Sequence, residues 1–239
     1  MADDCIAIHF QPQIEPATGR ILSVEALARW DGEDNAKLLF ERATRGGLKE
    51  DLSRYAQRKA LRIAGAWAPP LSSLDLSINL LAEDLARAGY VEWLLAEISA
   101  AGLTADRVTI EITESSLLAD QALAAQRLGR LRAAGVRIAV DDFGTGYASM
   151  AYLTSLPLDA LKIDGGLVAD LVNGKRDRIV VKAMISLARE LDLKVVVEGV
   201  ETEEQLALLA EWGCDLYQGF FCSAALDEQN LARFLDAAA

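Results

Sequence analysis

Seven polar residues of this chain each lie at or near the end of a short apolar run that is typical of a β-strand. They are Glu25, Asn79, Glu111, Asp141, Lys162, Glu198 and Gln218. In a parallel barrel, the carboxyl ends of successive strands meet at one face, so polar groups that are far apart in the sequence can build one site. We therefore predict that these side chains converge at one mouth.

Acids dominate this set, because Asp142 follows Asp141 and brings the number of carboxylates to five. Two carboxylates about 4 Å apart repel each other by about 4 kcal/mol at an effective dielectric constant of about 20. Such a cluster must take up protons, spread apart or bind cations. Of these three outcomes, we expect the binding of divalent metal ions.

The apolar runs that would position these residues alternate with stretches of helical periodicity, which predicts an α/β fold with a parallel sheet. The runs span residues 21–27, 74–80, 108–112, 136–140, 158–163, 194–197 and 216–219. A helix is expected over residues 52–67. Asp120 should cap another helix, and Thr202 with Gln205 forms a capping box for a helix that ends at Gly213.

Residues 177–193 also show helical spacing, and this stretch has a predicted packing face. The apolar positions in it are Ile179, Ala183, Ile185, Leu187 and Leu191. We expect them to pack on the barrel and to have no further role.

Length and composition favour one globular domain over residues 1–239, because 239 residues with 52% hydrophobic content suit one barrel. Cys5, Cys214 and Cys222 are widely spaced and form no Cys-x-x-Cys pair. This pattern argues against a disulfide framework and a zinc knuckle, and it favours a cytoplasmic location. The sequence has neither a long apolar run nor a basic, apolar amino terminus, so we expect no membrane contact by this segment and no signal peptide.

The net charge of −12 argues against a nucleic-acid polymer as a partner, because most of the surface would repel it. A small anionic ligand remains compatible with this charge if metal ions receive it. The only histidine, His9, lies in the first apolar run. A single histidine excludes histidine-rich metal phosphodiesterase sites and argues against a Ser-His-Asp triad.

The tripeptide Glu25-Ala26-Leu27 is the one that names the EAL family of cyclic di-GMP phosphodiesterases, and nearly the whole chain resembles this family. The other matching motifs follow in the family's order and at its approximate spacing. They are Phe10-Gln11-Pro12, Thr18-Gly19-Arg20, Arg29-Trp30, Ser77-Ile78-Asn79-Leu80, Glu111-Ile112-Thr113-Glu114-Ser115, Asp141-Asp142-Phe143-Gly144-Thr145-Gly146, Leu161-Lys162-Ile163-Asp164, Glu198-Gly199-Val200-Glu201-Thr202 and Gln218-Gly219.

The resemblance implies a modified TIM (β/α)8 barrel whose first strand, at about residues 7–11, runs antiparallel to its neighbours. It also implies two metal ions, and purely oxygen ligands favour Mg²⁺ or Mn²⁺ over zinc. The first ion would be held by Glu25, Asn79, Glu111 and Asp141. The second ion would be held by Asp141 as a bridge, by Asp142 and by Glu198.

Two such ions about 3.5 to 4 Å apart can activate one water and stabilise the attacking and leaving oxygens of a phosphodiester. Asp141 and Asp142, being adjacent, are expected to leave the strand end in different directions, which would suit bridging by one and single ligation by the other.

Three further residues have implied catalytic roles. Lys162, which by itself would be read as a neutralising salt bridge, would orient the attacking water or stabilise phosphoryl charge. Glu198 can be a metal ligand or a general base, and both roles stay open. Residues 142–149 resemble a loop that helps to hold the second ion and links to a dimer interface. Glu114 would anchor that loop, although by itself it reads as a helix cap or surface acid.

For the ligand, the resemblance assigns Arg29 to a phosphate group, and Gln11 and Gln218 can bond guanine or phosphate edges. The chain departs from the family at residues 31–47, where a longer loop with a Phe-Ile-Pro stretch is usual. It departs again at Ala224 and Ala225, which replace an arginine-proline pair. Neither departure removes an implied metal ligand, but both bear on guanine contacts and affinity.

The implied activity is hydrolysis of cyclic di-GMP to linear pGpG in bacterial signalling, by a homodimer that can be fused to sensory or GGDEF domains outside this chain. One alternative is a catalytically weak sensor domain that binds cyclic di-GMP. Another is an interaction domain whose acids merely solvate strand ends. We favour the enzyme because sensors usually lack ligands that are all present here.

Overall fold

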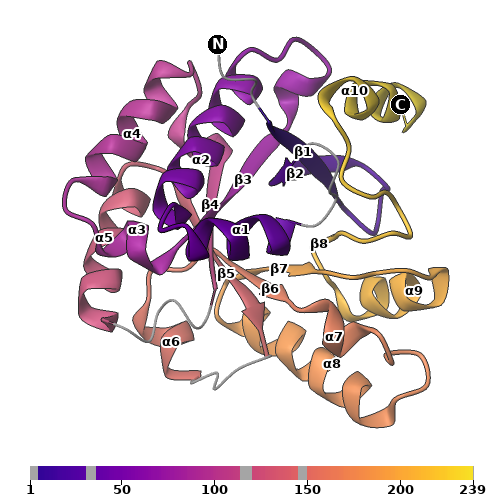
Figure 1. Cartoon of the computed structure of the whole chain (residues 1–239). Helices are drawn as coiled ribbons and strands as arrows, with labels where there is room; N and C mark the ends of the chain where they lie inside the picture. The colour runs from indigo at the N-terminus through magenta and orange to yellow at the C-terminus, as the bar shows by residue number, and fades with distance from the viewer. Residues whose placement is uncertain (1–4, 31–35, 114–119, 145–149, 239) are drawn as a thin grey trace.

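The computed structural model describes residues 5–30, 36–113, 120–144 and 150–238. Within them, eight strands close into a barrel in the order β1 to β8, and helices surround it (Figure 1). The strands are β1 (Ile6–Ile14), β2 (Ile21–Trp30), β3 (Asp75–Leu80), β4 (Val108–Thr113), β5 (Arg137–Phe143), β6 (Ala160–Ile163), β7 (Lys194–Val197) and β8 (Leu216–Tyr217).

Most of the helices lie between successive strands and cover the outside of the barrel (Figure 1). They are α1 (Ala36–Arg45), α2 (Lys49–Gly65), α3 (Ala82–Ala86), α4 (Tyr90–Ala100), α5 (Gln121–Ala133), α6 (Met150–Ser155), α7 (Gly165–Val168), α8 (Lys175–Glu190), α9 (Glu203–Trp212) and α10 (Glu228–Ala238).

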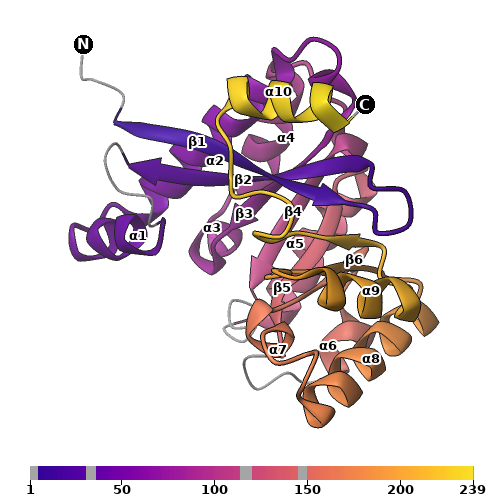
Figure 2. The same cartoon turned by 90° about the vertical axis from the view of Figure 1, so that its right-hand side faces the viewer.

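The first strand runs antiparallel to both neighbours, β2 and β8, whereas the remaining pairs are parallel. This arrangement confirms the predicted modified TIM barrel. The β1–β2 hairpin is long, and α10 lies beside it (Figure 2). Its register places Gln11 opposite Glu25. Because β1 runs the other way, its amino-terminal half approaches the same face as the carboxyl ends of β2 to β8.

Strand alternation explains why one face of each strand is polar and the other apolar. Ile78, Ile110 and Val140 alternate with inward-facing polar residues and pack in the hydrophobic core between barrel and helices. Parallel pairing then aligns neighbouring polar positions, with Asn79 opposite Glu111. The core therefore holds the strand ends at which the acids lie.

The predicted helix boundaries at Asp120 and Thr202 are confirmed. The Asp120 side chain accepts a hydrogen bond from the Leu123 amide at 3.0 Å. Thr202 and Gln205 form the capping box, and Gly213 ends α9 in the left-handed conformation with φ 81°. These caps fix where α5 and α9 begin.

The predicted packing face of α8 is partly wrong. Ile179 is 61% exposed and Ala183 also faces solvent, although Ile185 is buried as expected. The buried residues of this helix are Val181, Met184, Ile185 and Ala188. These follow the i, i+3, i+4, i+7 spacing of one helix face, whereas the predicted set spread over more than one side.

Other differences concern element lengths. Strand β2 continues to Trp30 and β5 to Phe143. Helix α1 lies within residues 31–47, the segment that differs from the family pattern, and the sequence did not predict this helix. Cys5, Cys214 and Cys222 are free thiols. Among the described helices, none combines the length and apolar character needed to cross a bilayer.

Candidate active site

A buried lysine lies at the centre of the site. The Nζ atom of Lys162, on β6, lies 2.6 Å from Glu111, 2.7 Å from Glu198, 3.1 Å from Asp141 and 3.3 Å from Glu25. The lysine side chain is only 1% exposed. The structure thus brings together carboxylates from β2, β4, β5 and the end of β7, which the sequence separates widely.

Amide side chains orient Glu25 within this cluster. Asn79 Nδ2 donates to Glu25 Oε1 at 2.8 Å, and Gln218 Nε2 donates to Glu25 Oε2 at 2.8 Å and to Glu198 Oε1 at 3.0 Å. Gln218 Oε1 in turn accepts a hydrogen bond from Gln13 Nε2 at 3.0 Å. Both ends of the Gln218 amide are therefore occupied by protein groups.

Gln13 was missed by the sequence reasoning. Ser23 Oγ donates to Gln13 Oε1 at 2.6 Å, which leaves the Gln13 amide nitrogen to bond Gln218. The signal that could have found Gln13 is its position, two residues after Gln11 on the same face of β1.

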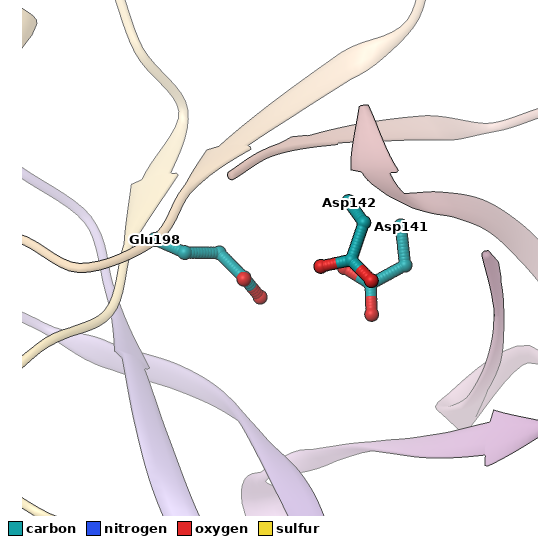
Figure 3. A group of neighbouring side chains, drawn as sticks. All are labelled: Asp141, Asp142 and Glu198. Carbon is teal, nitrogen blue, oxygen red and sulfur yellow. The ribbon is translucent and has the colours of Figure 1, made fainter. Parts of the chain in front are cut away.

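Asp141, Asp142 and Glu198 form a second group, in which one oxygen of each lies within 4.8 Å of the others. Figure 3 shows the two aspartate carboxylates side by side, facing Glu198 across the gap. We expected the side chains of Asp141 and Asp142 to point in different directions, but their carboxylates lie next to each other. The reason is a register shift in β5 between Val140 and Phe143, together with a left-handed Asp142 at φ 55°.

Burial and charge set the protonation of the cluster. Burial, reinforced by the nearby Glu25 and Asp141 carboxylates, raises the pKa of Glu111 well above its usual value. Burial also raises the pKa of Glu198 to about 7, although Lys162 opposes the shift. For Lys162, burial lowers the pKa, but the surrounding carboxylates outweigh it and the net pKa is well above normal.

Glu25 shifts in the opposite direction. Burial alone would raise its pKa, yet the charge of Lys162 and the hydrogen bonds from Gln218 and Asn79 outweigh burial and lower the pKa. Glu25 is thus held as a carboxylate while Glu198 and Glu111 retain protons more readily. One lysine cannot neutralise all of these acids.

The donor atoms fit divalent metal ions. Asp141 Oδ1 is buried and has no aligned hydrogen-bond donor among the described residues, although the Lys162 ammonium lies 3.1 Å away as an ion pair. The carboxylate oxygens around it, with the amide oxygen of Asn79, are the hard ligands that Mg²⁺ and Mn²⁺ prefer. A divalent cation could bind this Asp141 oxygen, which accepts no hydrogen bond from the residues that the structure describes, and would offset the remaining negative charge of the acids.

A cavity of about 440 Å³ opens beside the cluster. Glu25, Asn79, Asp141 and Asp142 line it, together with Gln57 of α2. The sequence reasoning did not identify Gln57, because a lone glutamine in a helix gives no signal of what its amide contacts.

The remaining predicted residues lie around this mouth or outside the described part of the chain. Gln11 Nε2 is 3.4 Å from the Ser223 carbonyl oxygen, and Arg29 lies four residues beyond Glu25 on β2, where its Nη1 donates to the Ala28 carbonyl. Glu114 and residues 145–149 of the predicted loop are outside the described residues. Two aromatic residues that the sequence reasoning passed over, Phe220 and Phe221, follow Gln218 and are exposed, Phe220 by 72%.

Comparison with known proteins agrees with this geometry. Residues 2–225 match the EAL domain family. The chain is 38% identical over 242 residues to "Cyclic di-GMP phosphodiesterase NbdA" of Pseudomonas aeruginosa, which covers 99% of this chain and 31% of that protein. The chain spans about a third of the length of the curated relatives it matches.

Solved structures show the same fold. The "PaMucR Phosphodiesterase, c-di-GMP complex" superposes with a TM-score of 0.89 at 33% identity, covering 95% of this chain and 94% of that one. The "Klebsiella pneumoniae BlrP1 pH 6 manganese/cy-diGMP complex" superposes with a TM-score of 0.85 at 32% identity, covering 95% of this chain and 57% of that one. The match over nearly its full length shows that the chain belongs to the EAL domain family.

Proposed function

We propose that this chain hydrolyses one phosphodiester bond of cyclic di-GMP and releases linear pGpG, with Mg²⁺ or Mn²⁺ as cofactor. The observation that carries the proposal is the complete ring of Glu25, Glu111, Asp141 and Glu198 around Lys162 Nζ. It is supported by relatives and solved structures whose names include cyclic di-GMP phosphodiesterase activity or a cyclic di-GMP complex.

The proposed ligands form two overlapping sets. Glu25, Asn79, Glu111 and Asp141 would hold one ion, and Asp141, Asp142 and Glu198 the other. When bound, such ions supply positive charge that activates water and stabilises the oxygens of a phosphodiester displacement. The second set rests on the group of oxygens within 4.8 Å of one another.

Lys162 and Glu198 have different proposed roles in the reaction. Lys162 keeps its proton because carboxylates surround it, so it provides a fixed positive charge next to the site of phosphoryl transfer. Without bound metal, burial raises the pKa of Glu198 to about 7, whereas binding of the second ion would hold it deprotonated. Its proposed roles are therefore metal ligand, general base or both. Glu114 stays a proposed anchor of the neighbouring loop.

The ligand would lie across the same mouth. We propose that Arg29 binds a phosphate with its planar guanidinium and that Gln11 contacts a guanine or phosphate edge. Gln218, proposed from the sequence as a third contact, would act through Glu25 and Glu198, because its amide already bonds both. The exposed rings of Phe220 and Phe221 offer surfaces on which a guanine base can stack.

Metal-dependent product analysis tests this function. Purified protein incubated with cyclic di-GMP and Mg²⁺ or Mn²⁺ should form pGpG, separable by chromatography, and chelator should stop the reaction. Glu25→Gln should abolish turnover. Unchanged cyclic di-GMP in the presence of either metal, with ligand binding intact, would instead identify a sensor domain.

The wider context is also proposed. We infer that residues 1–239 act as a single EAL domain in the cytoplasm and that this domain works as a homodimer. The exposed Ile179 and Val180 of α8 offer an apolar surface for a second copy. Because the matching relatives are about three times longer than this chain, sensory or GGDEF domains can accompany it in a longer protein.

A further inference from the structure

A buried hydrogen-bond network lies behind Asn79, outside the ring of acids. Gln57 of α2 is 3% exposed, and its Nε2 donates to the Asn79 carbonyl oxygen at 2.9 Å and to Ser53 Oγ at 3.2 Å. The hydroxyl of Tyr90, on α4, donates to Gln57 Oε1 at 2.9 Å. Ser53 Oγ donates to Asp84 Oδ2 at 2.6 Å.

The hydrogen-bond directions in this network fix the orientation of the Gln57 amide. A serine hydroxyl carries one hydrogen, and Ser53 gives it to Asp84, so Ser53 can only accept from Gln57. Tyr90 supplies a hydrogen to Gln57 Oε1. Rotating the amide by half a turn would place Oε1 against the Asn79 carbonyl oxygen and would lose both bonds from Nε2.

Asn79 is the member of the site that most needs external support. Its side chain is the neutral ligand of the proposed first set, and Asn79 is exposed, whereas Glu25 and Glu111 are buried. Its Nδ2 is held from within the barrel by Glu25, and its backbone carbonyl is held from outside by Gln57. One contact restrains the side chain of Asn79 and the other restrains its backbone, so together they limit where its amide oxygen can lie.

We propose that Gln57 is a positioning residue for Asn79, locked in place by Tyr90 and by the Ser53–Asp84 pair. This inference rests on the proposed function, because it takes Asn79 to be a metal ligand. Gln57 also lines the cavity beside the acids, so the network links that wall to the site. The expected consequence is that Gln57 sets metal affinity without contacting the ion.

Two variants test the proposal without emptying the core. Gln57→Leu keeps the approximate volume and removes every hydrogen bond of the amide. Tyr90→Phe removes one hydroxyl, which donates to Gln57. Supporting groups behind a metal ligand typically change affinity by about 10- to 100-fold. We expect Gln57→Leu to weaken Mn²⁺ binding in a calorimetric titration by about 10-fold and Tyr90→Phe to weaken it by less.

A metal-free readout accompanies the titration. The side-chain amide resonances of Asn79 in an NMR spectrum of metal-free protein should shift or broaden in both variants. Gln121→Leu is the control: Gln121 is an exposed glutamine that bonds Ser155 at 2.8 Å, and its replacement should change neither readout. In an Asn79→Ala background, Gln57→Leu should have no further effect on Mn²⁺ affinity, whereas a general packing defect would add to the loss.

The outcomes separate this inference from the proposed function. If wild-type protein binds Mn²⁺ and forms pGpG while both variants keep their affinity within about twofold and leave the Asn79 resonances unchanged, the inference is wrong and the proposed function stands. If wild-type protein binds no Mn²⁺, both are wrong. If Gln57→Leu does not fold, Tyr90→Phe decides by the same criteria.

Discussion

Lys162 is the residue on which the metal-free site depends most. A buried ion pair is costly to break, because removing one partner leaves uncompensated charge, typically at about 3–5 kcal/mol. Here a single ammonium contacts carboxylates from separate strands. Its loss should affect both the stability of the barrel and the chemistry.

We therefore expect Lys162→Met to lower the free energy of unfolding of metal-free protein by about 3 kcal/mol or more and to abolish pGpG formation. Lys49→Met is the matched control, since Lys49 pairs with Glu83 at the surface and its loss should cost about 1 kcal/mol or less. Denaturant unfolding measures both. Equal effects of the two substitutions would contradict the role given to Lys162.

The raised pKa of Glu198 predicts how the stability of the metal-free protein depends on pH. Its pKa in the folded protein is about 7, above the ordinary value of 4.5. The contribution of Glu198 to the free energy of unfolding is therefore fully present below pH 4.5 and is lost as the pH rises to about 7. This pKa shift corresponds to a decrease in the free energy of unfolding of the metal-free protein on the order of 3 kcal/mol. Burial shifts Glu111 in the same direction, whereas Glu25 has the opposite dependence.

Divalent ions should reverse this trend, because they replace protons on the carboxylates. We expect Mg²⁺ to raise the melting temperature more at pH 8 than at pH 5, and Glu198→Gln to reduce the pH dependence of the metal-free protein. Thermal unfolding with and without Mg²⁺ between pH 5 and pH 8 measures these changes in melting temperature. A metal effect that is larger at pH 5 would contradict the argument.

At the scale of elements, the bulge in β5 matters most, because it turns two successive residues toward one site. A left-handed backbone at a non-glycine residue costs about 1 kcal/mol or more, and aspartate and asparagine tolerate it best. The pKa of Asp142 is raised by burial and by the neighbouring Asp141, so the pair repels in the absence of metal. At Asp142, strand β5 therefore carries both backbone strain and electrostatic repulsion.

Asp142→Asn should keep the backbone conformation and remove the repulsion. We expect the metal-free variant to be as stable as wild type or more stable, while its affinity for Mn²⁺ falls by about 10-fold or more. Asp192 provides the control, because it has the same left-handed conformation at φ 56° but lies in an exposed turn after α8. If Asp192→Asn changes Mn²⁺ affinity as much as Asp142→Asn does, Asp142 is no ligand.

Element order could be predicted because it follows from local rules: apolar runs end at polar residues, and caps such as Asp120 and Thr202 mark helix starts. The antiparallel β1 came from family resemblance, since periodicity is the same in either direction. The bulge at Asp142 could not be predicted, because nothing in its sequence signals the extra residue. Gln13 and Gln57 were missed because their roles depend on contacts between residues far apart in the chain.

At the scale of the whole molecule, the exposed apolar residues of α8 bear on assembly. Ile179 is 61% and Val180 43% exposed, on a helix whose other face is buried in the core. The sequence prediction assigned Ile179 to the barrel because its set of apolar positions covered more than one side of the helix; an exposed apolar patch of this kind can serve as an interaction site.

Ile179→Lys should therefore shift a dimer toward monomer in light scattering, without changing the fold. Leu48→Lys is the control, because Leu48 is 56% exposed but precedes α2, which lies on a different side of the barrel from α8 (Figure 1). A monomeric wild-type protein at micromolar concentration, or a dimer that Ile179→Lys leaves intact, would show that this surface does not join two copies.

The central claim is that the acids around Lys162 form a site for divalent ions next to the scissile phosphate. Anomalous diffraction from crystals grown with Mn²⁺ and cyclic di-GMP tests it directly. We predict two manganese peaks, one ligated by Glu25, Asn79, Glu111 and Asp141 and the other by Asp141, Asp142 and Glu198. Bound ligand with no manganese peak at these residues would contradict the account.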